Sequence, residues 1–105
     1  MAETCTFRIW MAGDYATAVA ATREWCIDGG DCYAVAACDF VFSGGLESGV
    51  CVTRINYGRF PETEEALVVR VNKFAAFLAE RLFQKSYSVE GPRVTTYTKC
   101  EGPWS

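Results

Sequence analysis

The amino-acid sequence predicts an α+β fold in which two helices cover one face of an antiparallel sheet. Two observations lead to this expectation. Short segments alternate apolar and polar residues, as β-strands do, and two longer segments repeat apolar residues with a helical period. The two kinds of segment follow one another in the order β-α-β-β-α-β. The 105 residues, half of them apolar, are enough for one domain with a hydrophobic core.

The first strand is expected over residues 4–11, where apolar and polar side chains alternate. This alternation places Phe7 and Ile9 on the face that the helices cover. It places Arg8 and Trp10 on the opposite face, which we call the open face.

The first helix is expected from Tyr15 to about Ile27. Asp14 is suited to cap it, because its carboxylate can accept hydrogen bonds from the first free backbone N–H groups. The alanine-rich middle of the segment favours a helix. Gly29 and Gly30 are expected to end it, because glycine tolerates the left-handed conformation found after many helices.

Two further strands are expected over residues 32–42 and 50–57, with a glycine turn between them. The alternation in all three strands assigns side chains to the two faces of the sheet. The helices are expected to cover Cys5, Phe7, Ile9, Phe40 and Ile55. The open face is expected to carry Arg8, Trp10, Tyr33, Asp39, Val52, Arg54 and Asn56.

The second helix has the clearest pattern. Thr63 can cap it, and Glu64 and Glu65 lie where the positive end of the helix dipole favours acidic residues. Apolar residues then recur every three or four positions and predict a buried stripe of Leu67, Val71, Phe74, Leu78 and Leu82.

After this helix, residues 86–89 are expected to form a fourth strand, and residues 94–98 a fifth strand or an extension of the fourth. The resulting order is that of a ferredoxin-like sandwich with a four- or five-stranded sheet. We expect residues 1–105 to form a single domain, with residues 1–3 and 101–105 loosely ordered.

Composition excludes several functions. Thirteen acidic residues against ten basic ones give a net charge of −3, which makes nucleic acid an improbable partner. The sequence holds neither an apolar run of membrane-spanning length nor the layout of a signal peptide. We therefore expect no membrane partner and a cytoplasmic location.

The six cysteines include no C-x-x-C pair, and the closest neighbours are six residues apart. In a reducing compartment, free thiols are favoured over disulfides or a zinc site, although both alternatives stay open. We expect no cofactor.

The chain contains no histidine, so a general base would have to be an acidic residue or a lysine. Asp28 and Asp31 flank two glycines and are interpreted as solvated loop charges. The acidic residues before and in the second helix are interpreted as complements of the helix dipole or as an acidic partner-binding patch. These observations favour a protein without catalytic activity.

The open face is the candidate interaction surface, because Trp, Tyr and Arg are enriched in binding hot spots. An alternative is a satisfied surface on which Arg8 and Arg54 pair with Asp39. The partner would be a foreign protein or a second copy of the chain. The candidate partner-binding residues are Arg8, Trp10, Tyr33, Arg54, Asn56, Glu62, Glu64 and Glu65.

Three stretches resemble short proteins of phages and mobile elements: FRIWMAGDYATAV, INYGRFP and ETEEAL. The resemblance extends to anti-CRISPR proteins. It implies a phage-encoded inhibitor that sterically blocks a host protein or effector complex in the host cytoplasm.

The predicted function is therefore a non-enzymatic protein-binding module. The alternative is a dimeric ferredoxin-like domain that binds a small molecule, or a cofactor-independent enzyme of that kind. This alternative predicts a closed apolar cavity lined by Phe40, Tyr57 and Phe74.

Overall fold

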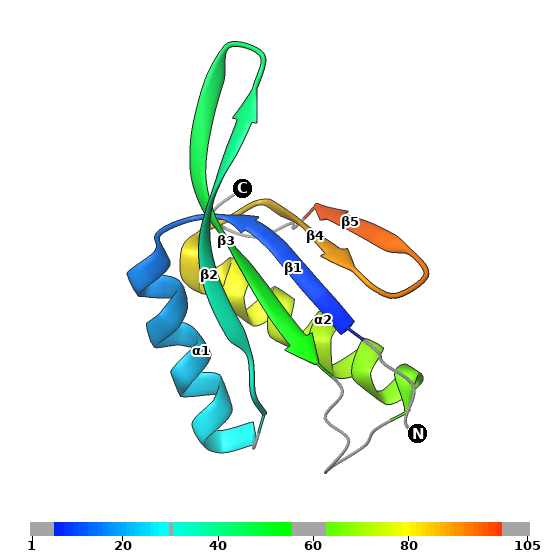
Figure 1. The fold of residues 1–105 in the computed structure, drawn as a ribbon. Helices are drawn as coiled ribbons and strands as arrows, with labels where there is room; N and C mark the ends of the chain where they lie inside the picture. Colours follow the sequence, from blue (N-terminus) through cyan, green and yellow to red (C-terminus); the bar gives the residue numbers. More distant parts are fainter. Residues whose placement is uncertain (1–5, 30, 56–62, 100–105) are drawn as a thin grey trace.

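The computed structural model describes residues 6–29, 31–55 and 63–99, in which five strands form one antiparallel sheet and two helices pack on one face (Figure 1). The elements in chain order are β1 (Thr6–Ala12), α1 (Tyr15–Gly29), β2 (Ala34–Phe42), β3 (Gly45–Ile55), α2 (Glu64–Leu82), β4 (Ser86–Glu90) and β5 (Thr95–Lys99). In space, the strands are ordered β2-β3-β1-β4-β5. The predicted α+β, ferredoxin-like architecture is confirmed, and β5 is a separate strand paired with β4.

Both helices begin at the predicted caps. The Asp14 carboxylate accepts hydrogen bonds from the backbone N–H of Thr17 at 2.9 Å and from its hydroxyl at 2.8 Å, and these bonds lower the pKa of Asp14. The Thr63 hydroxyl accepts a hydrogen bond from the backbone N–H of Ala66 at 3.1 Å. Helix α2 ends at Phe83, whose left-handed backbone lets its N–H bond to carbonyl groups of the last turn.

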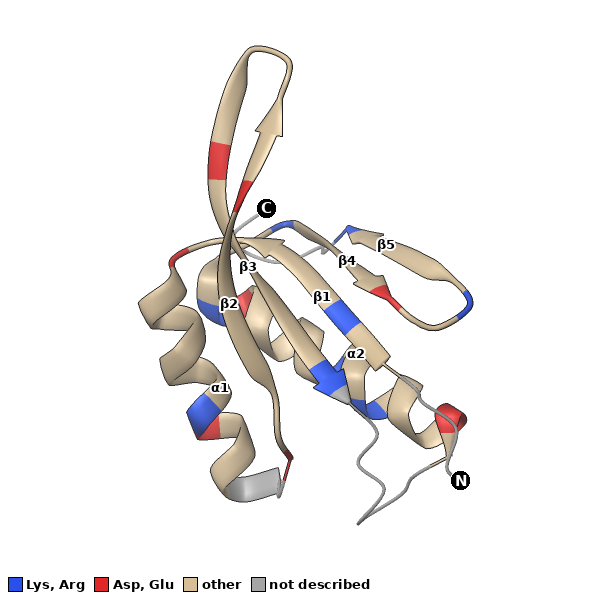
Figure 2. Ribbon diagram, in the orientation of Figure 1, with Lys and Arg blue, Asp and Glu red and all other residues tan. Residues whose placement is uncertain are grey.

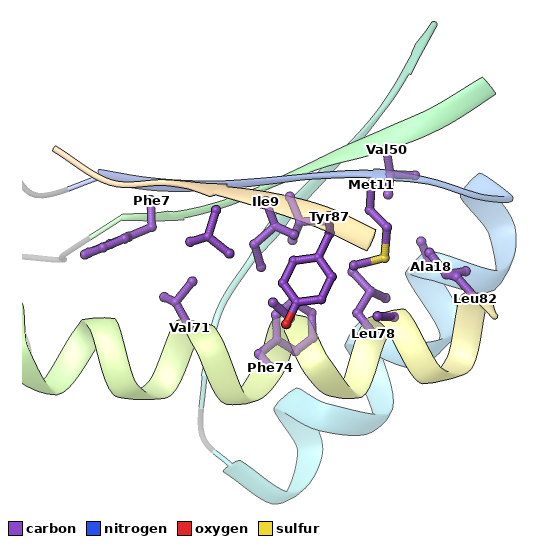
Figure 3. Packing of buried hydrophobic residues seen from close by; sticks show 14 of the residues in the cluster. Phe7, Ile9, Met11, Ala18, Val50, Val71, Phe74, Leu78, Leu82 and Tyr87 are labelled. Carbon is purple, nitrogen blue, oxygen red and sulfur yellow. The ribbon is translucent and has the colours of Figure 1, made fainter. Parts of the chain in front are cut away.

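The predicted stripe on α2 forms one side of the core. Leu67, Val71, Phe74, Leu78 and Leu82 are all buried. Figure 3 shows Phe7, Ile9 and Met11 of β1 directed from the sheet toward this helix. The helix-facing assignment of Phe7 and Ile9 is therefore confirmed.

The face assignment of β2 and β3 is wrong. In the register of β1 and β3, Ile9 lies opposite Val52, and Phe7 lies opposite Arg54. Because paired residues point to the same face, Val52 and Arg54 lie under the helices. Tyr33 likewise packs against the core, whereas Phe40 contacts Trp10 edge-to-face on the open side.

The reason for this error is that β3 is apolar on both faces. Val50 and Val52 alternate with Cys51 and Ile55, so hydrophobicity alone does not determine which set faces the helices. The register with β1 decides it.

Strand β3 is also longer than expected and begins at Gly45, so that β2 and β3 form a hairpin that extends beyond the rest of the sheet (Figure 1). Gly49 is required where this hairpin leaves the sheet. A Cβ atom there would lie 2.3 Å from a ring carbon of Phe40 and 2.5 Å from the carbonyl oxygen of Met11. No other residue fits without moving the backbone.

The two helices are joined by a charged contact between α1 and the last turn of α2. The Arg81 guanidinium donates a hydrogen bond of 2.8 Å to the Glu24 carboxylate of α1 and lies 4.6 Å from the centre of the Phe77 ring. The hydrogen bond from Arg81 lowers the pKa of Glu24.

The cap of α2 provides a test of the fold. Replacing Thr63 by alanine is expected to lower the free energy of unfolding by about 1 kcal/mol, because the Ala66 N–H loses its acceptor. Thr63→Ser keeps the hydroxyl and should stay within a few tenths of a kcal/mol of the wild type. Urea denaturation measures both, and equal losses in the two variants would show that the hydroxyl does not matter.

Neither helix of the described residues is long and apolar enough to cross a membrane. Some of the predictions fall outside the described residues and are not tested by the structure. They concern the two loosely ordered tails, Asn56 and Glu62 of the candidate site, Cys5 on the helix-facing side, and Tyr57 of the alternative cavity.

Candidate functional site

A buried carboxylate, that of Asp31, lies where α1, β3 and α2 meet. The side chain of Asp31 is only 1% exposed. Its Oδ1 accepts a hydrogen bond of 2.9 Å from Nε of Arg54 on β3, and its Oδ2 accepts one of 3.1 Å from the indole N–H of Trp25 on α1. A guanidinium nitrogen of Arg70 on α2 lies 3.6 Å from Oδ1. Figure 2 shows basic segments at the end of β3 and on the neighbouring part of α2.

The Asp31–Arg54 pair is energetically expensive, because the Arg54 side chain is also buried, at 7% exposed. Removing two charges from water costs several kcal/mol, which mutual attraction and hydrogen bonds must offset. Such a pair can serve the fold, since it ties the α1–β2 connection to β3 and α2. Buried ionisable clusters beside a hollow are also typical of functional sites.

Aromatic rings form the inner wall of this site. Tyr33 stacks on Phe74 with ring centres 4.2 Å apart, and Trp25 contacts both Phe74 and Phe77. The hydroxyl of Tyr33 is buried without a well-formed hydrogen bond. Burial raises the pKa of Tyr33, and the nearby Asp31 charge adds to the rise, so the phenol keeps its proton at neutral pH.

Two hollows border Asp31. The first, of about 490 Å³, is called the α2 hollow, and its lining residues are Trp25, Asp31, Ala66, Val69, Arg70 and Lys73. The second, of about 380 Å³, is called the α1 hollow, and its lining residues are Tyr15, Val19, Thr22, Arg23, Cys26, Asp31, Cys32, Tyr33 and Val35. Both have the size of small-molecule sites.

The residues predicted for the open face do not form one surface. Arg8 and Trp10 do lie on that face. However, the Trp10 indole N–H donates to Glu90 at 2.9 Å, and Arg8 lies 3.8 Å from the same carboxylate. Tyr33 and Arg54 lie on the opposite side, under the helices. The alternative, in which Arg8 and Arg54 pair with Asp39, is also wrong, because Arg8 pairs with Glu90 and Arg54 with Asp31.

Glu64 and Glu65 occupy the first turn of α2, as predicted, and Glu64 lies 3.6 Å from Arg93. Sequence reasoning missed Trp25 and Arg70 as site residues. It also interpreted Asp31 as a solvated loop charge, which is wrong because its side chain is buried. No motif in the sequence connects these three positions.

Three of the described cysteines have a pKa that disfavours the reactive thiolate. Cys26, Cys38 and Cys51 form no disulfide, and burial raises the pKa of all three thiols. A raised pKa leaves less thiolate at neutral pH. In the described part of the chain, no three potential ligands among Cys, Asp and Glu gather closely enough to hold a metal ion.

Comparison with known proteins identifies no family model and no curated protein that matches the chain. Two solved structures share its fold. A phage SAM lyase in the apo state superposes with a TM-score of 0.70 and 17% identity over 93% of this chain and 90% of that chain. A phage SAM lyase in complex with S-methyl-5'-thioadenosine gives a TM-score of 0.67 and 15% identity over 93% and 91% of the two chains.

These structures contradict the expected non-enzymatic binding module. The fold they share with this chain, over nearly its whole length, is that of an enzyme. The alternative of a small-molecule-binding domain or enzyme fits better. Its expected cavity is nevertheless wrong, because Phe40 lies on the open side and Phe74 fills the core. The neighbours support the phage part of the resemblance and give no support to an anti-CRISPR role.

Proposed function

We propose that the protein is a lyase that cleaves S-adenosylmethionine and releases S-methyl-5'-thioadenosine. The observation that carries the proposal is the likeness in fold, over 93% of the chain, to phage SAM lyase, in one case with that nucleoside bound. The α2 hollow is the proposed substrate site. Its volume of about 490 Å³ suits a ligand of this size.

The product defines the bond that breaks. S-methyl-5'-thioadenosine keeps the adenosyl and methyl groups on sulfur, so the cleaved bond joins sulfur to the γ-carbon of the aminobutyrate chain. Its electron pair goes to sulfur, which changes from a cationic sulfonium to a neutral thioether. A lyase adds no water, so the remaining fragment either closes on itself or loses a β-proton to form an alkene.

We favour closure, in which the substrate's own carboxylate attacks the γ-carbon and gives homoserine lactone. Among the described residues that line the α2 hollow, Asp31 is the one acidic side chain, and it is hydrogen-bonded to Arg54 and Trp25. It is poorly placed to take a β-proton. Ring closure needs no proton transfer, because the nucleophile is already ionised and the leaving group is neutral.

The absence of histidine favoured a protein without catalytic activity only on the assumption that the protein must supply a base. Ring closure does not need one. Here the protein needs only to hold the carboxylate near the γ-carbon and to exclude water, because the two opposite charges cancel as the new bond forms and their hydration would oppose this step.

Trp25 is the proposed contact for the adenosyl or sulfonium part of the substrate. Its hydrogen bond to Asp31 and its contacts with Phe74 and Phe77 fix the ring. An indole face can stack on adenine or attract a cation. The cytoplasmic location expected from the sequence remains part of this proposal.

The proposal is tested by incubating the purified protein with S-adenosylmethionine in heavy-oxygen water. We expect S-methyl-5'-thioadenosine and unlabelled homoserine lactone in equal amounts, detected early by mass spectrometry. A protein-free sample corrects for spontaneous decay, and S-adenosylhomocysteine, which lacks the sulfonium charge, should remain intact. Product formation no faster than in the protein-free sample would refute the activity, and homoserine carrying heavy oxygen as the first product would identify a hydrolase.

A further inference from the structure

Two cysteines border the α1 hollow. Cys26 lies in the last part of α1 and Cys32 lies just before β2, and both line the hollow. The Cys26 sulfur accepts a hydrogen bond from the backbone N–H of Tyr33, whose nitrogen is two bonds from the Cα of Cys32. The Cys26 sulfur therefore lies within about 6 Å of the Cα of Cys32. This closeness makes the pair a candidate for a disulfide, which tolerates no wide separation of its two residues.

The segments that carry the two thiols are held together by the buried carboxylate. Trp25 and Asp31 are the residues that directly precede the two cysteines. The Trp25 indole donates to the Asp31 carboxylate at 3.1 Å, and Arg54 donates to it at 2.9 Å. Each thiol is thus one residue from an anchored side chain, so the folded chain keeps the pair together.

The surroundings of the two thiols differ in the way that a reactive pair requires. Cys32 is exposed, so a soluble oxidant can reach it. Cys26 is half-buried, and burial raises its pKa, so it has the smaller share of thiolate. An accessible cysteine beside a second, resolving cysteine is the arrangement found in redox-sensitive proteins. We therefore expect Cys32 to react first and Cys26 second.

We propose that Cys26 and Cys32 are a redox-active pair, which closes into a disulfide when the chain meets a small disulfide such as oxidised glutathione. The Cys32 thiolate attacks one glutathione sulfur, forms a mixed disulfide and releases the first glutathione thiolate. The Cys26 thiolate then attacks the Cys32 sulfur and releases the second. The two protons that the cysteines lose end on the two glutathione thiolates, so one protein disulfide replaces one glutathione disulfide.

The new bond would act on the segment that carries the buried carboxylate. It encloses Asp31 in a loop of seven residues, 26–32, and so links oxidation to the cluster between the two hollows. The inference does not depend on the proposed function, because only the thiols of the chain react.

The sequence supplies a matched comparison. Cys32 is six residues from Cys26 and six residues from Cys38, so closing either loop has the same entropic cost in an unfolded chain. In the folded chain, β2 is extended between Ala34 and Cys38 and spans about 13 Å there, which holds Cys38 away from Cys32. Only the fold therefore favours the pair of Cys26 and Cys32.

The test incubates the full chain with oxidised glutathione, quenches it with acid and blocks the remaining thiols with N-ethylmaleimide. Digestion with trypsin, Asp-N protease and chymotrypsin separates Cys26, Cys32 and Cys38 onto different peptides. Mass spectrometry of early samples should show the bond between Cys26 and Cys32 in at least about tenfold excess over the bond between Cys32 and Cys38. In urea, the two bonds should form in amounts within about threefold of each other.

Three variants check the order of the steps. Cys26→Ser should stop at the mixed disulfide of Cys32 with glutathione. Cys32→Ser should take up glutathione on Cys26 at least about fivefold more slowly, because that thiol is half-buried. Cys38→Ser is the control and should close the bond between Cys26 and Cys32 at a rate within about twofold of the wild type.

The inference is overturned if the folded chain forms both bonds equally, or if it keeps glutathione on Cys32 without closing the loop. It is also overturned if the folded chain stays reduced under conditions that oxidise the chain in urea. None of these outcomes bears on the cleavage of S-adenosylmethionine, which is measured separately on the reduced protein.

Discussion

Replacing Asp31 by alanine is expected to lower the free energy of unfolding by about 3–5 kcal/mol, because it leaves a buried guanidinium without its principal carboxylate. The Arg54 side chain is 7% exposed, and its Nε donates to Asp31 at 2.9 Å. Urea denaturation measures the change. The matched control is Asp39→Ala on the exposed part of β2, which should stay within about 0.5 kcal/mol.

A double variant separates the structural from the functional role of this pair. Asp31→Leu combined with Arg54→Met replaces both charges by apolar groups of similar size and should recover most of the lost stability. We expect the double variant to fold but not to cleave S-adenosylmethionine, because Trp25 loses its hydrogen-bond acceptor and Arg70 its neighbouring charge. Recovery of both stability and activity would show that the pair serves the fold alone.

The parts of the fold that the sequence predicted are those governed by local pattern. The stripe on α2 runs over about five turns, and its period has no alternative interpretation. Asp14 and Thr63 could be identified as caps because capping depends on residues three positions apart. The faces of β3 could not be assigned, because both of its faces are apolar and the register with β1 is a long-range property.

The site was beyond prediction for the same reason. Trp25, Asp31, Arg54 and Arg70 come from four separate segments, and no two of them form a recognisable motif. A loop aspartate between glycines is ordinarily solvated, and only the positions of β3 and α2 show that this one is buried. The functional prediction failed at a different step, because the lack of histidine removes one kind of general base and says nothing against a reaction in which the protein moves no proton.

Phe74 connects the core to the site. Its ring is fully buried in the core, stacks on Tyr33 at 4.2 Å and contacts Trp25 at 5.5 Å, so it supports two side chains that border the hollows. A change in the core is therefore expected to affect binding as well as stability.

Replacing Phe74 by alanine is expected to lower the free energy of unfolding by about 3–5 kcal/mol, because a buried aromatic ring is lost and a cavity remains. In a domain of this size, such a loss lowers the melting temperature by at least about 12 °C. The control is Phe42→Ala near the tip of the β2–β3 hairpin, where the ring is 58% exposed. It should change the stability by no more than about 0.5 kcal/mol.

The same variant links packing to the site. At a low temperature where Phe74→Ala remains folded, binding of S-methyl-5'-thioadenosine should still be weaker than in the wild type, since Trp25 loses one of the two rings that hold it. Phe42→Ala should bind normally. Unchanged binding by folded Phe74→Ala would mean that Trp25 is positioned by Asp31 and Phe77 without help from the core. A stability loss no larger than that of Phe42→Ala would contradict the burial of Phe74 itself.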